Sequence, residues 1–356
     1  MLQNGEADDK LCNVKQLKRK QTMETTEEWF HYKTKIQTEG NNSMERLKRK
    51  AVHGVIPPII TPLDEKERVD EEGFRKLLRY CVDSGLHGIF VAGSNGETMA
   101  LTQEERNRAI RIAIDEAGKD VPVICGVMDS STKRVIDNIK ALEQMGGQYA
   151  VITPVFYARH ATQDETVRHF EEISRETNIS LVIYNIPPFT SQTLTPETIF
   201  RIAEIDKVVG YKDSSGRMGD FMKCLKHFRD RDDFFLMQGS TPLSAASMLL
   251  GADGYVPSLA PAFPLPFVRM YEVGARGDIE ATIAWNDVLM ETDKIYPMAK
   301  NQTASTKYAI ARHGFTDKRV AMPSEPITEA EMAMIDAQIE RVLAMIDETE
   351  QKWGNR

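Results

Sequence analysis

Cysteine is scarce in this sequence, and its spacing excludes two classes of protein. The 356 residues contain four cysteines, with no CxxC pair among Cys12, Cys81, Cys125 and Cys224. Small disulfide-stapled domains use many cysteines, and cysteine zinc sites usually use closely spaced pairs. Cys81 and Cys125 lie inside apolar runs, where a thiol is an ordinary small core residue. The pattern predicts reduced thiols and a cytoplasmic protein.

Long hydrophobic runs and an excess of basic charge are also missing. The sequence has no apolar stretch of about 18 residues and no N-terminal signal-peptide core, so we expect no membrane span. Its 45 Lys and Arg residues are outnumbered by 53 Asp and Glu residues, for a net charge of −8. Nucleic-acid-binding proteins usually concentrate positive charge on one face. We therefore expect no nucleic-acid partner.

Motifs for common cofactors and metals are absent as well. The sequence contains neither GxGxxG nor a P-loop, the usual cradles for nucleotide phosphates. Its seven histidines form no HExxH motif or comparable ligand cluster. We therefore expect neither a metal nor an organic cofactor, so any catalysis would have to use the side chains themselves.

The first 50 residues differ in character from the rest. They are polar, lack sustained periodicity and end in the basic run RLKRK at residues 46–50. We interpret residues 1–50 as a poorly ordered basic extension, with a targeting or nucleic-acid-binding arm as the alternative. Met44 is a candidate for the natural start, because ordered-looking sequence begins just after it.

From residue 51 onward, short apolar runs alternate with amphipathic segments. Strands are predicted at residues 55–60, 88–92, 121–127, 149–153, 181–186, 208–212, 234–238 and 254–259. Helices are predicted at residues 71–84, 103–117, 132–145, 164–177, 196–204, 218–228 and 242–250. Eight strands, each followed by a helix, predict a (β/α)8 TIM barrel, with an open doubly wound sheet as the alternative. We assign the barrel core to 51–265, and the last barrel helix plus a C-terminal helical extension to 266–356, with three helical patterns there.

Lys212 is the most informative residue for function. It ends the apolar run Val208-Val209-Gly210-Tyr211-Lys212, and active sites of barrels lie at the C-terminal ends of their strands. Burial lowers the pKa of a lysine, and a neutral amine condenses with ketones to form a Schiff base. Alternation along the strand places Gly210 on the same face, where its missing side chain leaves space. The ordinary alternative is a lysine that reaches solvent.

Other strand ends supply polar groups that suit carbonyl chemistry. Tyr184 ends the preceding strand, and the same alternation directs its phenol toward Lys212, where it can move a proton. The turn Gly93-Ser94-Asn95-Gly96 offers a hydroxyl and backbone N–H groups, so Ser94 and the Asn95 N–H are candidates to bind a carboxylate. A tight strand-to-helix turn is the structural alternative. Ser214 is a further candidate substrate-binding residue, and we expect Glu97 to cap N–H groups of its own turn.

These segments resemble the dihydrodipicolinate synthase / N-acetylneuraminate lyase superfamily of pyruvate-dependent class I aldolases. Gly93-Ser94-Asn95-Gly96-Glu97 resembles its pyruvate-carboxylate loop, Tyr184-Asn185-Ile186-Pro187 its catalytic tyrosine segment, and Gly210-Tyr211-Lys212-Asp213 its Schiff-base strand. Gly239 and Val256 fall at its pocket positions. The resemblance implies a (β/α)8 barrel with C-terminal helices, assembled as a homotetramer, that acts on pyruvate and an aldehyde. Within the superfamily, the motifs resemble 4-hydroxy-2-oxoglutarate aldolases most.

Two positions depart from the family's pattern. Dihydrodipicolinate synthases typically have a carboxylate-binding arginine where Phe189 stands here, which argues against aspartate semialdehyde as the acceptor. The family also usually places a proton-relay tyrosine, lent to a neighbouring subunit, where this chain has Phe156. Tyr157 follows it and is the candidate replacement, although a one-residue displacement in an extended strand reverses the direction of a side chain.

Three functions are consistent with these residues. The first is a class I lyase that makes or cleaves a 2-oxo acid through a pyruvate Schiff base, of the 4-hydroxy-2-oxoglutarate or 2-keto-3-deoxy-acid aldolase kind. The second is a related synthase or 2-keto-acid dehydratase that uses the same lysine. The third is a non-catalytic protein that binds 2-oxo acids. The first is our prediction.

Overall fold

The computed structural model describes residues 45–354, which form a closed barrel of eight parallel strands. Around the sheet the strand order is β1-β8-β7-β6-β5-β4-β3-β2, and a bridge between Pro58 and Phe90 joins the first segment to the second. The strands are β1 Gly54–Val55, β2 Ile89–Val91, β3 Val123–Gly126, β4 Tyr149–Ile152, β5 Ser180–Asn185, β6 Val208–Asp213, β7 Phe235–Gln238 and β8 Gly254–Tyr255. The predicted (β/α)8 fold is confirmed, although β1 and β8 are much shorter than expected.

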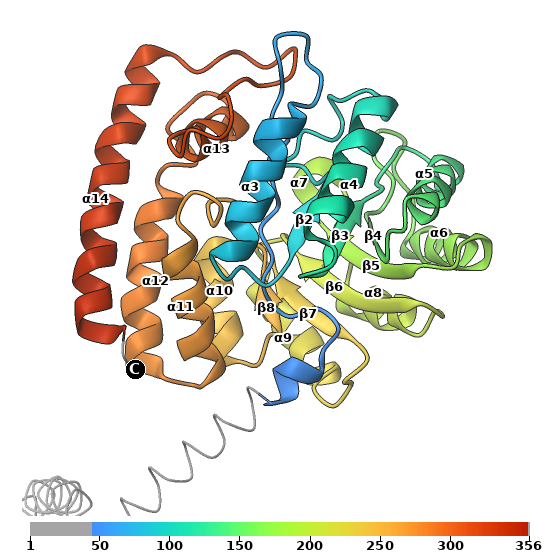
Figure 1. Cartoon of the computed structure of the whole chain (residues 1–356). Helices are drawn as coiled ribbons and strands as arrows, with labels where there is room; N and C mark the ends of the chain where they lie inside the picture. The colour runs from blue at the N-terminus through green and yellow to red at the C-terminus, as the bar shows by residue number, and fades with distance from the viewer. Residues whose placement is uncertain (1–44, 355–356) are drawn as a thin grey trace, which may run out of the picture.

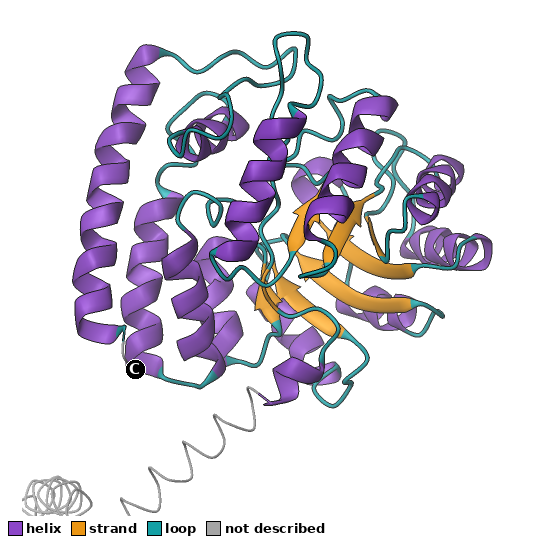
Figure 2. Cartoon of the chain, viewed as in Figure 1, coloured by secondary structure: helices purple, strands orange, loops and turns teal. Residues whose placement is uncertain are grey.

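Helices surround the barrel, as Figure 1 and Figure 2 show. Those that follow the strands are α3 Glu71–Asp83, α4 Gln103–Ala117, α5 Thr132–Gln144, α6 Gln163–Glu176, α8 Pro196–Ala203, α9 Met218–His227, α10 Thr241–Leu249 and α11 Pro264–Ala275. The short α7, Pro187–Thr190, was not expected and sits directly after β5. Within residues 45–354, no helix is long and apolar enough to cross a membrane.

The C-terminal region contains more helix than the sequence pattern indicated. After α11 come α12 Ile279–Asp293, α13 Gln302–Ala311 and α14 Glu329–Trp353, so residues 264–353 contain four helices instead of the expected three. The long α14 lies against α12 on the outside of the molecule (Figure 1). An ion pair between Arg269 and Glu350 joins it to α11. The extension is therefore packed onto the barrel.

The interior of the barrel is filled by inward-facing side chains. Val182 and Tyr184 on β5 face the same interior cluster as Phe235 and Met237 on β7. Between these strands, Gly210 leaves the room that the Phe235 ring occupies, since a Cβ at residue 210 would lie 2.3 Å from that ring. The space beneath Lys212 is therefore filled by a neighbouring aromatic ring, which gives the lysine an apolar floor.

Residues 45–50 belong to the folded body, so the poorly ordered extension that we expected over residues 1–50 does not include them. Residues 45–49 form a helix, and Leu47 is buried at 1% exposure. The Lys50 amine is buried at the N-terminal end of the barrel, where it donates to the Phe234 carbonyl and pairs with Asp253. Arg46 also pairs with Asp253, at 2.9 Å. The proposed start at Met44 and the remainder of the extension lie outside the described residues.

Candidate active site

Lys212 lies inside the C-terminal mouth of the barrel, as the strand alternation predicts. It is 4% exposed, and its Cα pairs in register with Tyr184 on β5 and Met237 on β7. The amine nitrogen lies 4.1 Å from the centroid of the Tyr184 ring and 4.6 Å from that of Phe90. Burial lowers the pKa of Lys212 to about 7. No ion pair among residues 45–354 includes Lys212 to restore its charge, so part of the amine population is neutral near pH 7.

The Tyr184 phenol is surrounded by serine hydroxyls. Ser214 donates a hydrogen bond to it at 3.4 Å, and Ser94 contacts it from the other side of the mouth. Burial raises the pKa of Tyr184 well above its usual value. The phenol therefore stays protonated at neutral pH and has a hydrogen-bond path to two further hydroxyls.

The loop after β2 is held rigidly in place. The Asn95 side chain donates to the Pro58 carbonyl at 2.8 Å, and Thr61 donates to the Gly96 carbonyl at 2.7 Å. These bonds attach the loop to the segment after β1. No hydrogen bond within the described part of the chain uses the Asn95 backbone N–H, which leaves this donor free beside Ser94.

Glu97 has a different role from the expected one. Its carboxylate accepts a hydrogen bond from the Ala321 N–H at 2.8 Å and forms a buried ion pair with Lys307 of α13. The prediction that Glu97 caps its own turn is wrong, because its side chain extends to the C-terminal region instead. No sequence pattern connected these two segments, which are separated by about two hundred residues.

Small residues at the ends of the next strands leave room around the amine. A Cβ on Gly239 would lie 2.1 Å from the Ser214 hydroxyl oxygen and 3.1 Å from the Lys212 Cε. The Ser214 N–H donates to the Asn185 carbonyl at 2.8 Å, which positions its hydroxyl between β5 and β6. Val256, just after β8, is buried in the barrel interior. The structure thus brings these three predicted pocket residues to the same mouth.

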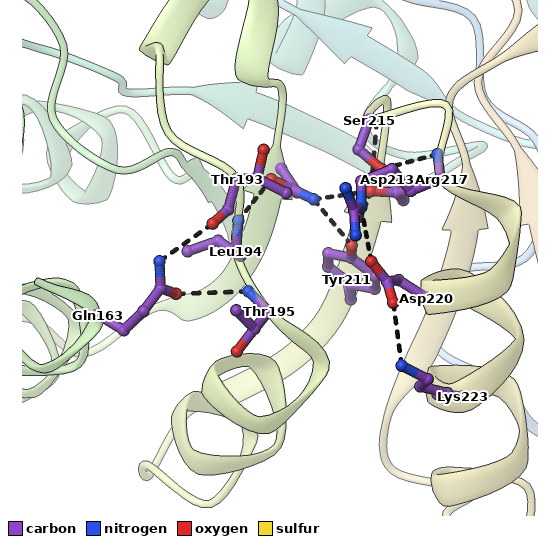
Figure 3. A network of polar contacts seen from close by, with 11 residues as sticks. Gln163, Thr193, Leu194, Thr195, Tyr211, Asp213, Ser215, Arg217, Asp220 and Lys223 are labelled. Carbon is purple, nitrogen blue, oxygen red and sulfur yellow. Dashed lines mark hydrogen bonds and ion pairs between the residues drawn. The ribbon is translucent and has the colours of Figure 1, made fainter.

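Behind Lys212, a polar network on the outer face of β6 supports the strand end. Asp213 accepts hydrogen bonds from the Tyr211 hydroxyl at 2.7 Å, the Asn185 amide at 2.9 Å and the Ser215 hydroxyl at 2.9 Å (Figure 3). Burial raises the pKa of Asp213 despite these donors. Sequence reasoning missed this support, although alternation along β6 already separated Asp213 from Lys212.

A cavity of ≈ 410 Å³ opens above Ser94 and Tyr184. It is lined by Ser94, Glu97, Thr98, Met99, Ala100, Met128, Thr153, Phe156, Tyr184, Ile186, Phe189, Thr190, Asn301, Thr303 and Ser324. No lysine or arginine is among these residues, and the one carboxylate is already paired with Lys307. The cavity is therefore mainly apolar, and the C-terminal region, which sequence reasoning did not connect to the site, provides part of its wall.

Two aromatic residues near the mouth differ in position. Phe189 lines the cavity and is 66% exposed, as expected for a residue at the rim. Tyr157 is fully exposed, has a φ of 67° and does not line the cavity of its own chain, whereas Phe156 does. The arginines Arg159 and Arg217, whose loops follow β4 and β6, do not line the cavity either; Arg217 pairs with Asp220 (Figure 3).

The geometry agrees with the family that the motifs resemble. The model of the dihydrodipicolinate synthetase family matches residues 51–342. The chain belongs to this family. It is accordingly a class I aldolase-like carbon–carbon lyase. The lysine, the tyrosine and the loop whose motifs resemble the family's lie together at one end of this barrel. No group of three or more potential metal ligands occurs among the described residues.

Several relatives share most of the chain. A 4-hydroxy-tetrahydrodipicolinate synthase from Neisseria meningitidis serogroup C is 29% identical over 287 residues, which cover 80% of this chain and 97% of the relative. An uncharacterised DapA-like lyase from Halobacterium salinarum is 29% identical over 289 residues, 81% of this chain and 93% of the relative. Among solved structures, dihydrodipicolinate synthase from Bacteroides thetaiotaomicron superposes with a TM-score of 0.77 at 28% identity, covering 81% of this chain and 98% of that one. The Escherichia coli K12 prophage protein YagE in complex with pyruvate has a TM-score of 0.77 at 24% identity, covering 82% and 98%.

Proposed function

We propose that this protein is a Schiff-base lyase that joins pyruvate to an aldehyde, or cleaves the resulting 4-hydroxy-2-oxo acid. The observation that carries the proposal is the buried Lys212 amine, with a pKa of about 7, beside the Tyr184 ring. A desolvated lysine that is partly neutral at pH 7 is the nucleophile that ketone condensation requires. The amine lies next to the ring of Tyr184, which lines the cavity that a small 2-oxo acid would enter.

The side chains support a complete reaction. Neutral Lys212 attacks the ketone carbon of pyruvate, and loss of water leaves an iminium. Removal of a methyl proton gives an enamine, whose carbon adds to the aldehyde while the aldehyde oxygen takes up a proton. Water then releases the 2-oxo acid and restores the amine, and cleavage runs in reverse. In this proposal Tyr184 moves these protons, and Ser94 with the Asn95 N–H holds the pyruvate carboxylate.

The cavity favours an uncharged acceptor. A carboxylate on the acceptor would find no lysine or arginine in the cavity lining, and Phe189 at the rim offers it no hydrogen-bond donor. Both aspartate semialdehyde and glyoxylate, the aldehyde that 4-hydroxy-2-oxoglutarate would release, carry such a carboxylate. An aldolase of the 2-keto-3-deoxy-acid kind, which can release an uncharged aldehyde, therefore fits the cavity better than one of the 4-hydroxy-2-oxoglutarate kind. Several relatives are named 4-hydroxy-tetrahydrodipicolinate synthase, an enzyme that uses aspartate semialdehyde. The acceptor experiment below therefore also tests this alternative function.

Covalent trapping tests the Schiff base. Incubation with pyruvate and borohydride should add one adduct per chain, on the peptide that contains Lys212. Lys212→Arg should give no adduct, because a guanidinium remains protonated. An adduct on another lysine would overturn the assignment, and no adduct on the wild type would favour a binding protein without catalysis.

Acceptor selectivity is tested separately. Pyruvate release should be faster from 4-hydroxy-2-oxo acids with an alkyl or aryl group at C4 than from 4-hydroxy-2-oxoglutarate. In the condensing direction, Phe189→Arg should improve kcat/KM for aspartate semialdehyde. Wild-type turnover of aspartate semialdehyde on the order of 10⁴ M⁻¹s⁻¹ or more, typical of enzymes on their own substrates, would make the synthase the correct function.

A further inference from the structure

The most unusual feature outside the reacting groups is the buried ion pair between Glu97 and Lys307. The Lys307 side chain is 0% exposed and that of Glu97 is 6% exposed. Lys307 also donates to the Arg319 carbonyl at 2.7 Å, so one amine links the β2 loop, α13 and the segment before α14. Burial lowers the pKa of Lys307, while Glu97 opposes this change. Such a pair is a costly way to gain stability, because both charges lose their solvation.

The pair lies one hydrogen bond from the predicted carboxylate site. The Glu97 N–H donates to the Ser94 carbonyl at 3.1 Å, and the two residues line the same cavity. Glu97 has a φ of 55°, a left-handed conformation that is strained for a residue with a side chain. A strained residue persists only where its surroundings hold it, and the carboxylate is held by Lys307 and the Ala321 N–H.

We propose that Glu97 and Lys307 are positioning residues, which hold Ser94 and the Asn95 N–H in the geometry that binds the carboxylate of the 2-oxo acid. The C-terminal helical region thereby completes the substrate site, because its α13 supplies the buried cation that fixes the β2 loop. This inference rests on the proposed function, in which Ser94 contacts the carboxylate. It predicts that loss of the pair weakens pyruvate binding more than it slows the chemistry at Lys212.

The readout is borohydride trapping at different pyruvate concentrations, which requires no knowledge of the acceptor. Lys307→Met should raise the pyruvate concentration for half-maximal trapping at least about fivefold, while changing the rate at saturation less than about twofold. The double variant Lys307→Met/Glu97→Gln removes both charges and should recover part of the Tm lost in Lys307→Met, since no unpaired charge stays buried. Its half-saturation concentration should stay raised.

The chain offers a matched control at the other end of the barrel. Lys50 and Asp253 form an equally buried pair, with both side chains 1% exposed. Lys50→Met should lower the Tm while leaving the half-saturation concentration unchanged. If it raises that concentration as much as Lys307→Met does, the effect is general destabilisation and the proposal is wrong. Full recovery of pyruvate binding in the double variant would also contradict it.

Ser94→Ala separates failure of this inference from failure of the proposed function. It should raise the half-saturation concentration about tenfold, as expected for the loss of one charge-assisted hydrogen bond. An unchanged value would overturn the carboxylate role of Ser94, and the positioning proposal with it. A raised value in Ser94→Ala together with a wild-type value in Lys307→Met would overturn the positioning proposal alone.

Discussion

At the scale of single residues, the reactivity of Lys212 derives from burial. The Tyr184 and Phe90 rings border its amine, and burial alone lowers its pKa to about 7. We expect the rate of trapping with pyruvate to rise about tenfold between pH 6 and pH 8, as the neutral fraction of an amine with this pKa does. Burial keeps the Tyr184 phenol protonated between pH 6 and pH 8, so loss of its proton should not lower the trapping rate in this range. A rate that first rises near pH 10 would show that Lys212 is exposed to water.

Tyr184 provides the second prediction at this scale. Tyr184→Phe retains the ring beside Lys212 and removes only the hydroxyl that contacts Ser214 and Ser94. We expect kcat to fall by roughly 10²–10⁴, the usual contribution of general acid–base catalysis. The Tm should change little, which circular dichroism can check. An unchanged kcat would mean that the proton travels by another route.

At the scale of elements, the ends of β6 and β7 approach each other too closely for a side chain at residue 239. The Gly239 N–H donates to the Asp213 carbonyl at 2.6 Å, and a Cβ would lie 2.8 Å from that oxygen. Overpacking of this kind typically costs 1–3 kcal/mol. We expect Gly239→Ala to lower the Tm and to reduce kcat at least about tenfold, because Ser214 and Lys212 must move.

Gly219 provides the matched control for this substitution. It lies in α9, and nothing lies within 4 Å of the position that its Cβ would take. Gly219→Ala should therefore leave kcat unchanged and stabilise the helix by less than the roughly 0.5–1 kcal/mol that alanine gains over glycine in a helix interior, because Gly219 lies in the first turn. Equal loss of activity in both variants would show that the crowding at residue 239 is not the cause.

At the scale of the whole molecule, Tyr157 is the residue through which we expect assembly to affect the site. Its side chain is fully exposed in the single chain, although its φ of 67° is costly for a tyrosine. We expect a homotetramer, as the family resemblance implies, in which Tyr157 lies against a neighbouring subunit. Sedimentation should then show a tetramer, and Tyr157→Phe should lower kcat without changing the Tm. A fully active monomer would contradict this role.

Much of the architecture was predictable from local patterns. Alternation along a strand decides which side chains share a face, so the approach of Lys212 and Tyr184 followed from the sequence once eight strand–helix units indicated a barrel. The ends of β1 and β8 were less predictable, because each strand spans two residues only and the residues that follow add single backbone hydrogen bonds or a bridge to neighbouring strands. The family motifs located Ser94, Gly239 and Val256 in the same way, since each follows a strand.

Contacts between distant segments were decided by the tertiary structure. The sequence by itself determined the barrel, the amine and the phenol, because period and position along one strand are local properties. It did not determine that Glu97 would pair with Lys307, that Asn301 and Ser324 would line the cavity, or that Lys50 would be buried with Asp253. A buried charge needs a partner, but the local sequence around the charged residue does not specify which distant residue supplies that partner. These partners are decided by tertiary packing. The C-terminal helices pack against one end of the barrel and residues 45–50 against the other.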